Sequence, residues 1–221
     1  MASNALLTRL SRADLGLLEP HLEAVELPTR MQLQARNKRI EHVFFLDSGI
    51  ASVVADGPRP IEVGMIGREG MTGLSVLLGS SERAPHETFM QIAGRGRRLS
   101  AANLRRALAV SRSLHQALLH HVHAFLAQTA QTALANGRSK LEERLARWLL
   151  LAHDRIDGDE LPITHEFLAV MLGVRRSGVT VALQELERRG LIAHRRALIT
   201  VLDREGLEES CGGTYAPPTD S

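Results

Sequence analysis

The chain has 221 residues, 44% of them hydrophobic, which suits one large domain or two small ones. Its formal net charge of +2 neither requires nor excludes nucleic acid as a partner. The single cysteine, Cys211, excludes an internal disulfide framework and a cysteine-cluster metal site. No apolar leader or long apolar run is present, which predicts a soluble, cytoplasmic protein without a membrane partner.

The N-terminal half predicts a short helical region followed by a β-rich roll. Residues 4–22 carry apolar side chains at helical spacing. Between residues 25 and 92, short apolar runs alternate with turn residues, a pattern typical of an antiparallel barrel or roll. The runs cover residues 43–46, 50–54, 61–63 and 89–92.

Several helices are predicted after the roll. Ser100 is a good N-cap for a helix over 101–110, and a much longer helix is expected from 113 to 136. The long helix has two apolar stripes, so one can cover the roll while the other meets a second copy of the chain. The first stripe is Leu114, Leu118, His121 and Phe125, and the second is Leu119, Val122, Leu126 and Ala133. Residues 140–156 predict a further amphipathic helix.

The strongest signal is ITHEFLAVMLGVRRSGVTVALQELERRGLI, residues 163–192, which has the pattern of a helix-turn-helix. Thr164 is a good N-cap for the first helix. Gly173 supplies the left-handed conformation that a tight turn between helices requires. Ala169 is small, so the second helix can cross closely over the first. The apolar positions expected inside are Leu168, Leu172, Val174, Val179, Ala182 and Leu183.

The exposed side of the second helix carries the residues that could read DNA. Arg175 and Arg176 stand at its N-terminal end, with Ser177 and Thr180 on the next turn. In a helix-turn-helix these positions face base edges in the major groove. Arginine can pair with guanine O6 and N7, whereas serine and threonine accept looser roles, and either arginine could instead hold a phosphate.

The segment AHRRALITVL that follows predicts a β-hairpin, or wing, carrying His194, Arg195 and Arg196. A wing beside a recognition helix commonly contacts the DNA backbone. The four arginines of helix and wing would supply a salt-dependent attraction that does not depend on base sequence. Ala197 occupies the turn position at which glycine is often present.

In this order, a glycine-punctuated roll, a long two-faced helix and a winged helix resemble the Crp/Fnr family of bacterial transcription regulators. The resemblance covers about residues 5–207 and is most specific in THEFLAVMLGVRRSGVTVALQELERRGLI. It implies an α+β fold: an antiparallel, cyclic-nucleotide-binding-like roll (1–112), a dimerisation helix (113–137) and a winged helix-turn-helix (138–207). The composition of the last residues, which include Cys211-Gly-Gly and Pro-Pro, predicts a disordered tail (208–221).

The family resemblance also implies a function. The protein would be a homodimer that binds two-fold symmetric, double-stranded DNA and regulates transcription, with RNA polymerase as a candidate partner. Arg176, Ser177 and Thr180 would read bases, and Thr164 and His165 would lie near phosphate. No cofactor is predicted.

The roll departs from the cyclic-nucleotide-binding members of the family. Those members carry a glycine-glutamate pair and, about ten residues later, an arginine-serine pair. This chain has Thr72-Gly73-Leu74 and then Arg83-Ala84. Arg83 could still meet a phosphate of an effector. Without the carboxylate, a ribose would lose a charge-assisted hydrogen bond worth about 1.5–3 kcal/mol. The sequence therefore does not predict cAMP as the effector, and it leaves open whether the roll binds an effector at all.

Three other functions remain open from the sequence. A metal- or haem-dependent sensor could use the histidines of the long helix, His115, His120, His121 and His123. A cupin-like enzyme would need histidines and carboxylates on strands, for which the candidates are His42, Glu62, His86 and Glu87. The third is a protein-interaction module whose helix-turn-helix does not bind DNA. No nucleophile elbow, P-loop or dinucleotide fingerprint is present, so an enzyme is not predicted.

Overall fold

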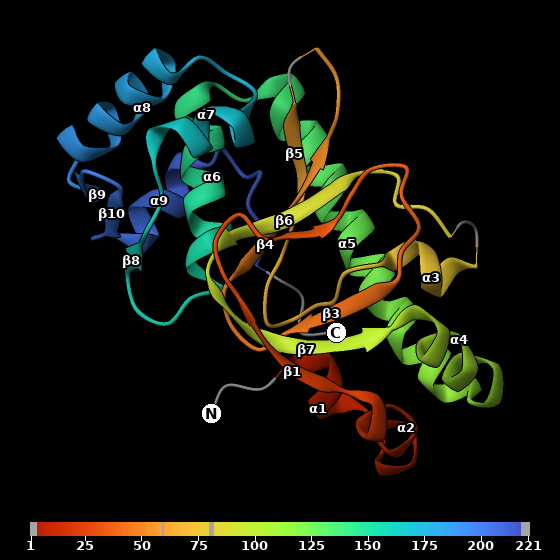
Figure 1. Cartoon of the computed structure of the whole chain (residues 1–221). Coiled ribbons are helices and arrows are strands. Elements are labelled where there is room, and N and C mark those ends of the chain that lie inside the picture. The colour runs from red at the N-terminus through yellow and green to blue at the C-terminus, as the bar shows by residue number, and fades with distance from the viewer. Residues whose placement is uncertain (1–3, 59, 80–81, 218–221) are drawn as a thin grey trace. The chain divides into compact units, whose positions relative to one another are not determined.

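A computed structural model describes residues 4–58, 60–79 and 82–217 (Figure 1). The chain divides into two compact units. The first takes in Met1–Val53 and Ile66–Leu126, and the second takes in Val54–Met65 and Ala127–Thr219. Helices and antiparallel strands occur together, which confirms the predicted α+β class. The prediction placed the whole of residues 1–112 in the roll domain, whereas in the structure Val54–Met65 groups with the C-terminal unit.

Helical segments open the described part of the chain, as predicted for residues 4–22. They are α1 (Ala5–Arg9), α2 (Arg12–Leu18) and the 3-10 helix η1 (Glu19–His21). The buried Asn4 caps α1 by accepting a hydrogen bond from the backbone N–H of Leu7. Its side-chain amide donates to the carbonyls of Leu46 and Gly70, at 2.8 Å each. Asn4 therefore holds the first helix against the roll.

The roll consists of two sheets. Its strands are β1 (Glu23–Leu27), β2 (Gln32–Gln34), β3 (His42–Leu46), β4 (Ile50–Ala55), β5 (Ile61–Ile66), β6 (Glu87–Ile92) and β7 (Gly94–Ser100). One sheet has three strands in the order β1-β7-β3, and the other has four in the order β2-β6-β4-β5. The predicted apolar runs form β3, β4, β5 and β6, whereas β1, β2 and β7 were not predicted.

The central strand β7 has the sequence GRGRRLS, which lacks an apolar alternation (Figure 1). It pairs antiparallel with both β1 and β3. A Cβ added to Gly94 would lie 2.1 Å from the carbonyl oxygen of Ser48, and one added to Gly96 would lie 2.5 Å from that of Phe45. The two glycines are therefore needed because neighbouring backbone passes directly over the strand.

Three helices complete the first unit: α3 (Leu74–Leu78), α4 (Ala101–Val110) and α5 (Arg112–Arg138), of which α5 continues into the second unit. Leu114 and Leu118 of α5 are fully buried in the core of the roll, as predicted for the first stripe. The prediction for Val122 is wrong: it was placed in the second stripe but is buried in the same core. Residues four apart stay close to one helix face, so Val122 continues the row of Leu114 and Leu118.

The second unit contains the C-terminal helices and a small sheet of order β8-β10-β9. Its elements after α5 are α6 (Leu141–His153), β8 (Glu160–Leu161), α7 (His165–Leu172), α8 (Arg176–Arg188), β9 (Ile192–Arg195), β10 (Leu198–Val201) and α9 (Arg204–Ser210). Leucines of α6 and the buried apolar residues of α7 and α8 form its core.

The segment Val54–Met65 is bound to this unit by side chains of α5 and α6. Trp148 Nε1 donates a buried hydrogen bond of 2.9 Å to Glu62 Oε1. The Gln128 amide pairs with the backbone of Met65, accepting from its N–H at 2.6 Å and donating to its carbonyl at 3.1 Å. These bonds satisfy buried polar groups, which explains why the segment groups with the C-terminal unit.

The disordered tail predicted for 208–221 is wrong for residues 208–217. The helix α9 extends to Ser210, and Cys211 behind it is fully buried. Arg147 Nε donates to the carbonyl of Thr214 at 3.0 Å, and burial raises the pKa of the Cys211 thiol to about 12. The Gly-rich composition suggested disorder, but these contacts fix the backbone. Residues 218–221 lie outside the described residues.

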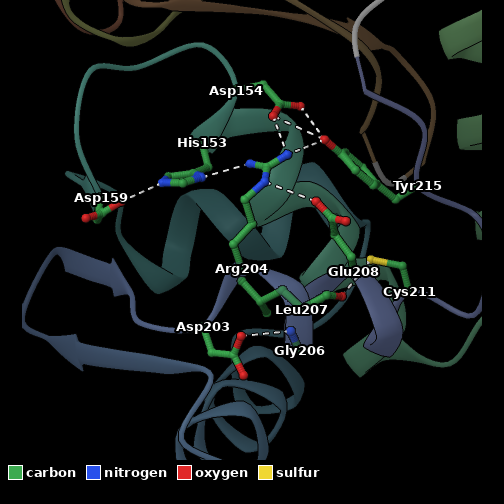
Figure 2. A network of polar contacts seen from close by, with 10 residues as sticks. All are labelled: His153, Asp154, Asp159, Asp203, Arg204, Gly206, Leu207, Glu208, Cys211 and Tyr215. Atoms are coloured by element: carbon green, nitrogen blue, oxygen red, sulfur yellow. Dashed lines mark hydrogen bonds and ion pairs between the residues drawn. The ribbon is translucent and has the colours of Figure 1, made fainter.

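Figure 2 shows how Arg204 joins α9 to the end of α6 and to this tail. Its guanidinium donates to Asp154 Oδ1 at 2.8 Å and to the Tyr215 hydroxyl at 2.6 Å, and lies 2.9 Å from His153 Nδ1. The Tyr215 hydroxyl in turn donates to Asp154 Oδ2 at 2.9 Å. Arg204 is thus a neutralised, structural cation of the second unit.

Candidate nucleic-acid interface

The helices α7 and α8 form the predicted helix-turn-helix. Thr164 caps α7 by accepting a hydrogen bond of 3.2 Å from the backbone N–H of Phe167. Gly173 ends α7 in the left-handed conformation, with φ of 64°. The N–H of Val174 then donates to the carbonyl of Ala169 at 2.9 Å, which closes the turn. These bonds fix the direction in which α8 leaves.

One face of α8 is buried against the rest of the unit. The buried side chains of the two helices are Leu168, Ala169, Met171, Leu172, Val179, Ala182, Leu183 and Leu186. Arg144 of α6 donates to the carbonyl of Leu172 and so satisfies one of the last carbonyls of α7. The opposite face of α8 is exposed to solvent.

The N-terminal end of α8 is strongly electropositive. Arg175 is the N-cap, Arg176 is the first helical residue, and the first turn contains no acidic residue. The helix dipole adds positive charge at this end. Within the described residues, the guanidinium groups of Arg175, Arg176, Arg195 and Arg196 are exposed and make no ion pair or hydrogen bond. Further along α8, Arg188 is instead bonded to Glu185 at 2.7 and 2.9 Å.

A polar cluster joins α7, α8 and β9. His165 Nδ1 lies 3.2 Å from Thr180 Oγ1, which also donates to the carbonyl of Arg176 at 3.2 Å. The rings of His165 and His194 are 5.7 Å apart. Glu187 accepts from the backbone N–H of His194 at 3.1 Å and lies 3.0 Å from its Nδ1. The cluster orients the wing relative to the recognition helix.

His165 has its pKa lowered below the usual value by this environment. Burial is the largest cause, because it disfavours the charged ring, and the nearby His194 and Arg176 add repulsion. The carboxylate of Glu187 faces His194 from α8, on the other side of the pair. A phosphate placed beside His165 would offset the repulsion that Arg176 exerts.

The wing is the hairpin of β9 and β10, in which Arg195 pairs with Leu198 and His194 with Ile199. Its turn contains Arg196 and Ala197, and Ala197 has a positive φ of 58°. A residue with a Cβ is strained in this left-handed region. The wing therefore forms without the glycine that its turn geometry favours.

The residues of the roll that correspond to a cyclic-nucleotide cassette make internal contacts. Thr72 Oγ1 accepts from the backbone N–H of Phe44 at 3.0 Å. A Cβ on Gly73 would lie 2.5 Å from Cγ1 of Val43, so the backbone is tightly packed there. Arg83, the candidate effector-binding residue, donates to the carbonyl of Asn37 at 2.7 Å, and Ala84 is buried.

The histidines of α5 do not converge on one point. His115 Nε2 lies 2.9 Å from the carbonyl of Leu77, and His121 Nε2 lies 3.1 Å from that of Met71. His120 and His123 are exposed. Among the described residues, no group of three or more histidines, cysteines and carboxylates is arranged to hold a metal ion.

The structure thus brings Thr164, His165, Arg176, Thr180 and His194 close together. Ser177 lies on the exposed face, and Arg195 and Arg196 lie on the wing. Sequence reasoning missed Glu187, Val181 and Gln184. A projection of α8 at 3.6 residues per turn would have found Val181 and Gln184, because they continue the face of Ser177.

No helix among the described residues is long and apolar enough to cross a membrane.

Comparison with known proteins agrees with this geometry. Residues 143–210 match the family model of the Crp-like helix-turn-helix domain. A CRP-family transcriptional regulator from Thermus thermophilus is 20% identical, with a TM-score of 0.71 over 89% of this chain and 100% of its own. FixK2 from Bradyrhizobium japonicum is 16% identical, with a TM-score of 0.73 over 85% and 96%.

A further solved structure, the c-di-GMP responsive global regulator CLP of Xanthomonas campestris, is 18% identical, with a TM-score of 0.68 over 86% of this chain and 99% of its own. No curated protein sequence matches the chain. At these identities the likeness establishes the fold, which confirms the predicted roll followed by a winged helix-turn-helix.

Replacing Ala197 by glycine should stabilise the C-terminal unit by about 0.5–1 kcal/mol. Relief of left-handed strain, about 1–2 kcal/mol, outweighs the extra unfolded-state entropy of glycine, about 0.5–1 kcal/mol. The free energy of unfolding can be measured in urea by the fluorescence of Trp148, the single tryptophan, which lies in this unit. Ala193→Gly in β9, where φ is not positive, is the matched control and should destabilise. A loss of stability in Ala197→Gly would contradict the assigned strain.

Protonation of His165 should destabilise the C-terminal unit at acidic pH. Because its folded-state pKa lies below the unfolded value of about 6.5, the unfolded chain binds the proton more readily, and stability rises with pH up to that value. His165→Gln should flatten this dependence below about pH 6.5, measured by Trp148 fluorescence. His120→Gln, at an exposed site on α5, should keep the wild-type slope. An unchanged slope in His165→Gln would count against the assignment.

Proposed function

We propose that the chain is a homodimeric, sequence-specific DNA-binding regulator of transcription. Two findings support this proposal: residues 143–210 match the Crp-like helix-turn-helix domain family, and the chain has the fold of Crp/Fnr regulators. The observation that carries the proposal is the set of exposed, unpaired guanidinium groups at the start of α8 and on the wing. Such groups match the phosphates and guanine edges of duplex DNA. RNA polymerase is the expected partner on that DNA.

The residues would divide the work by position. Arg176 and Ser177 stand at the exposed N-terminal end of α8 and would contact base edges. Arg175, the N-cap, would hold a phosphate together with the helix dipole. Thr180 would contribute to the fit against DNA through its shape rather than through a hydrogen bond to a base, because its hydroxyl is already bonded to Arg176 and His165. Thr164 and His165, at the start of α7, would approach the phosphate backbone of the DNA.

The wing would add affinity without specificity. Arg195 and Arg196 are exposed on the hairpin, and Glu187 holds His194 at its base. A cation on a hairpin reaches the phosphate backbone rather than the floor of the groove. Each such contact releases bound counterions, so its effect depends on salt.

The exposed face of α5 would form the dimer. Leu126 is 61% exposed, and Leu134 is 42% exposed. The face repeats at three- and four-residue intervals, as in a coiled-coil seam. Its exposed members are His123, Leu126, Ala130, Ala133 and Gly137, and the exposed Leu134 lies next to Ala133. Pairing through this face would cover exposed apolar surface and could set two recognition helices about 34–36 Å apart, one turn of DNA.

We assign no cyclic nucleotide to the roll. The side chain of Thr72 is bonded to Phe44, and that of Arg83 donates to Asn37. A cyclic phosphate would share Arg83 with the carbonyl of Asn37, and Leu74, at the cassette position of the glutamate, offers the ribose no carboxylate. We do not propose a histidine-based sensor either, because His115 and His121 each contact a backbone carbonyl of the roll.

Selection of bound duplexes from a random pool tests the proposal. The wild type should enrich a two-fold symmetric site with half-sites one helical turn apart. Arg176→Ala should cost about 1–3 kcal/mol on that site and relax the preference at one base pair of each half-site. Enrichment of no common sequence would overturn the proposed function, and an unaltered preference in Arg176→Ala would overturn the role of that residue.

Arg195→Ala is the matched control for Arg176→Ala, because it removes an exposed arginine from the wing. It should weaken specific and random DNA alike and lower the slope of log affinity against log salt by about 1. Fluorescence anisotropy at several salt concentrations distinguishes the two variants.

Leu126→Glu should raise the dimer dissociation constant at least tenfold, roughly 1.4 kcal/mol or more, because two carboxylates would meet in the seam. Sedimentation at micromolar concentration measures the change, and affinity for the symmetric site should fall with it. Leu78→Glu on α3, where the leucine is 55% exposed, is the control and should leave the dimer intact. A Leu126→Glu dimer as tight as the wild type would reject this seam.

A further inference from the structure

Val181 is an apolar residue on the exposed face of the recognition helix. Its side chain is 60% exposed, whereas the other apolar residues of α8 are buried. An exposed valine by itself indicates little, because single apolar residues are common on protein surfaces. Its position carries the argument. Val181 lies four residues after Ser177 and three before Gln184, so the three share one helix face.

The neighbours of Val181 limit what this face can offer to DNA. The hydroxyl of Thr180 is bonded to the carbonyl of Arg176 and to His165. The guanidinium of Arg188 is bonded to Glu185. The central part of the face therefore presents one apolar group, Val181, between the polar side chains of Ser177 and Gln184.

The positive charge near this face indicates what kind of partner surface would cover Val181. Unpaired guanidinium groups lie at the start of α8, on Arg175 and Arg176, and on the wing, on Arg195 and Arg196. An apolar protein partner would have to leave these cations without a counter-charge, whereas a duplex supplies phosphates. Within the major groove, the apolar group on natural base edges is the 5-methyl of thymine.

We propose that Val181 is a specificity-determining residue that contacts the 5-methyl group of one thymine in each half-site. The inference rests on the proposed function and adds a base preference to it. Burying the valine methyls against the thymine methyl removes both from water, which favours thymine over bases without a methyl group. The same contact would accept 5-methylcytosine, which carries an equivalent methyl group.

The helix also sets the distance between this thymine and the base read by Arg176. Residues 176 and 181 are five positions apart, so they are separated by roughly 7.5 Å along the helix axis. With about 3.4 Å between base pairs, this corresponds to roughly two base-pair steps. The thymine should therefore lie within about three base pairs of the position at which Arg176→Ala relaxes the preference.

The test uses the full-length protein and the symmetric duplex obtained by selection. Each thymine of a half-site is replaced in turn by deoxyuridine, which removes the 5-methyl group and keeps base pairing. Anisotropy should show one position at which deoxyuridine lowers the affinity of the wild type by roughly three- to tenfold. Val181→Ala should lose a similar factor on the thymine duplex and respond less than twofold to deoxyuridine there.

Val110→Ala on α4 is the matched control, because Val110 is also an exposed valine, at 74%, but lies in the first unit. It should keep the wild-type response at every thymine. Trp148 fluorescence establishes that Val181→Ala remains folded. A cytosine-to-5-methylcytosine exchange at the Val181 position should recover part of the affinity lost when the thymine pair is replaced.

The outcomes separate this inference from the proposed function. If the wild type binds no DNA, the proposed function fails, and the inference fails with it. If the wild type binds a specific site but Val181→Ala responds to deoxyuridine as strongly as the wild type does, the function stands and the inference is rejected. A selected half-site with no thymine near the Arg176 position would also reject it.

Discussion

Around Gly173 the backbone turns from α7 into α8 with φ of 64°, and three parts of the second unit meet there. The N–H of Val174 is bonded to Ala169, and the carbonyl of Leu172 accepts from Arg144 of α6. A Cβ on residue 173 would lie 3.0 Å from Cδ1 of Ile61, in the segment Val54–Met65. A side chain would therefore strain the backbone and displace Ile61. The direction of α8, and so the groups it exposes, depends on this residue having no side chain.

The electrostatics of the second unit follow from which cations have partners. Arg204 and Arg188 are neutralised by carboxylates, and Arg147 donates to the backbone of the tail. Arg175 and Arg176 are left exposed where the helix dipole already adds positive charge. After burial and His194, the charge of Arg176 is a further reason that the pKa of His165 is lowered. A net charge of +2 conceals this arrangement, because the balance of the whole chain does not describe the sign of one face.

Much of the fold could be predicted from the sequence, and the failures have physical causes. Helices with clear periodicity and strands with apolar runs were predicted because local pattern and burial agree there. The strand β7 was missed because Gly94 and Gly96 lower β-propensity, yet close backbone contacts require them. The ordered tail was missed because Thr214 and Tyr215 are held by Arg147 and Asp154, which are distant in sequence. The local amino-acid composition does not indicate tertiary contacts of this kind.

At the candidate site the sequence predicted the residue types and the structure changes how they can act. The family resemblance implied that Arg176, Ser177 and Thr180 read bases. The bonds of Thr180 to Arg176 and His165 occupy its hydroxyl, so the polar group that made threonine a candidate is already used. Val181 was passed over because sequence reasoning expects apolar residues of a helix to face inward. Its 60% exposure reverses that expectation. The turn at Gly173 fixes the direction of α8, whereas part of its buried face, Val179, Ala182 and Leu183, was already predicted from the sequence.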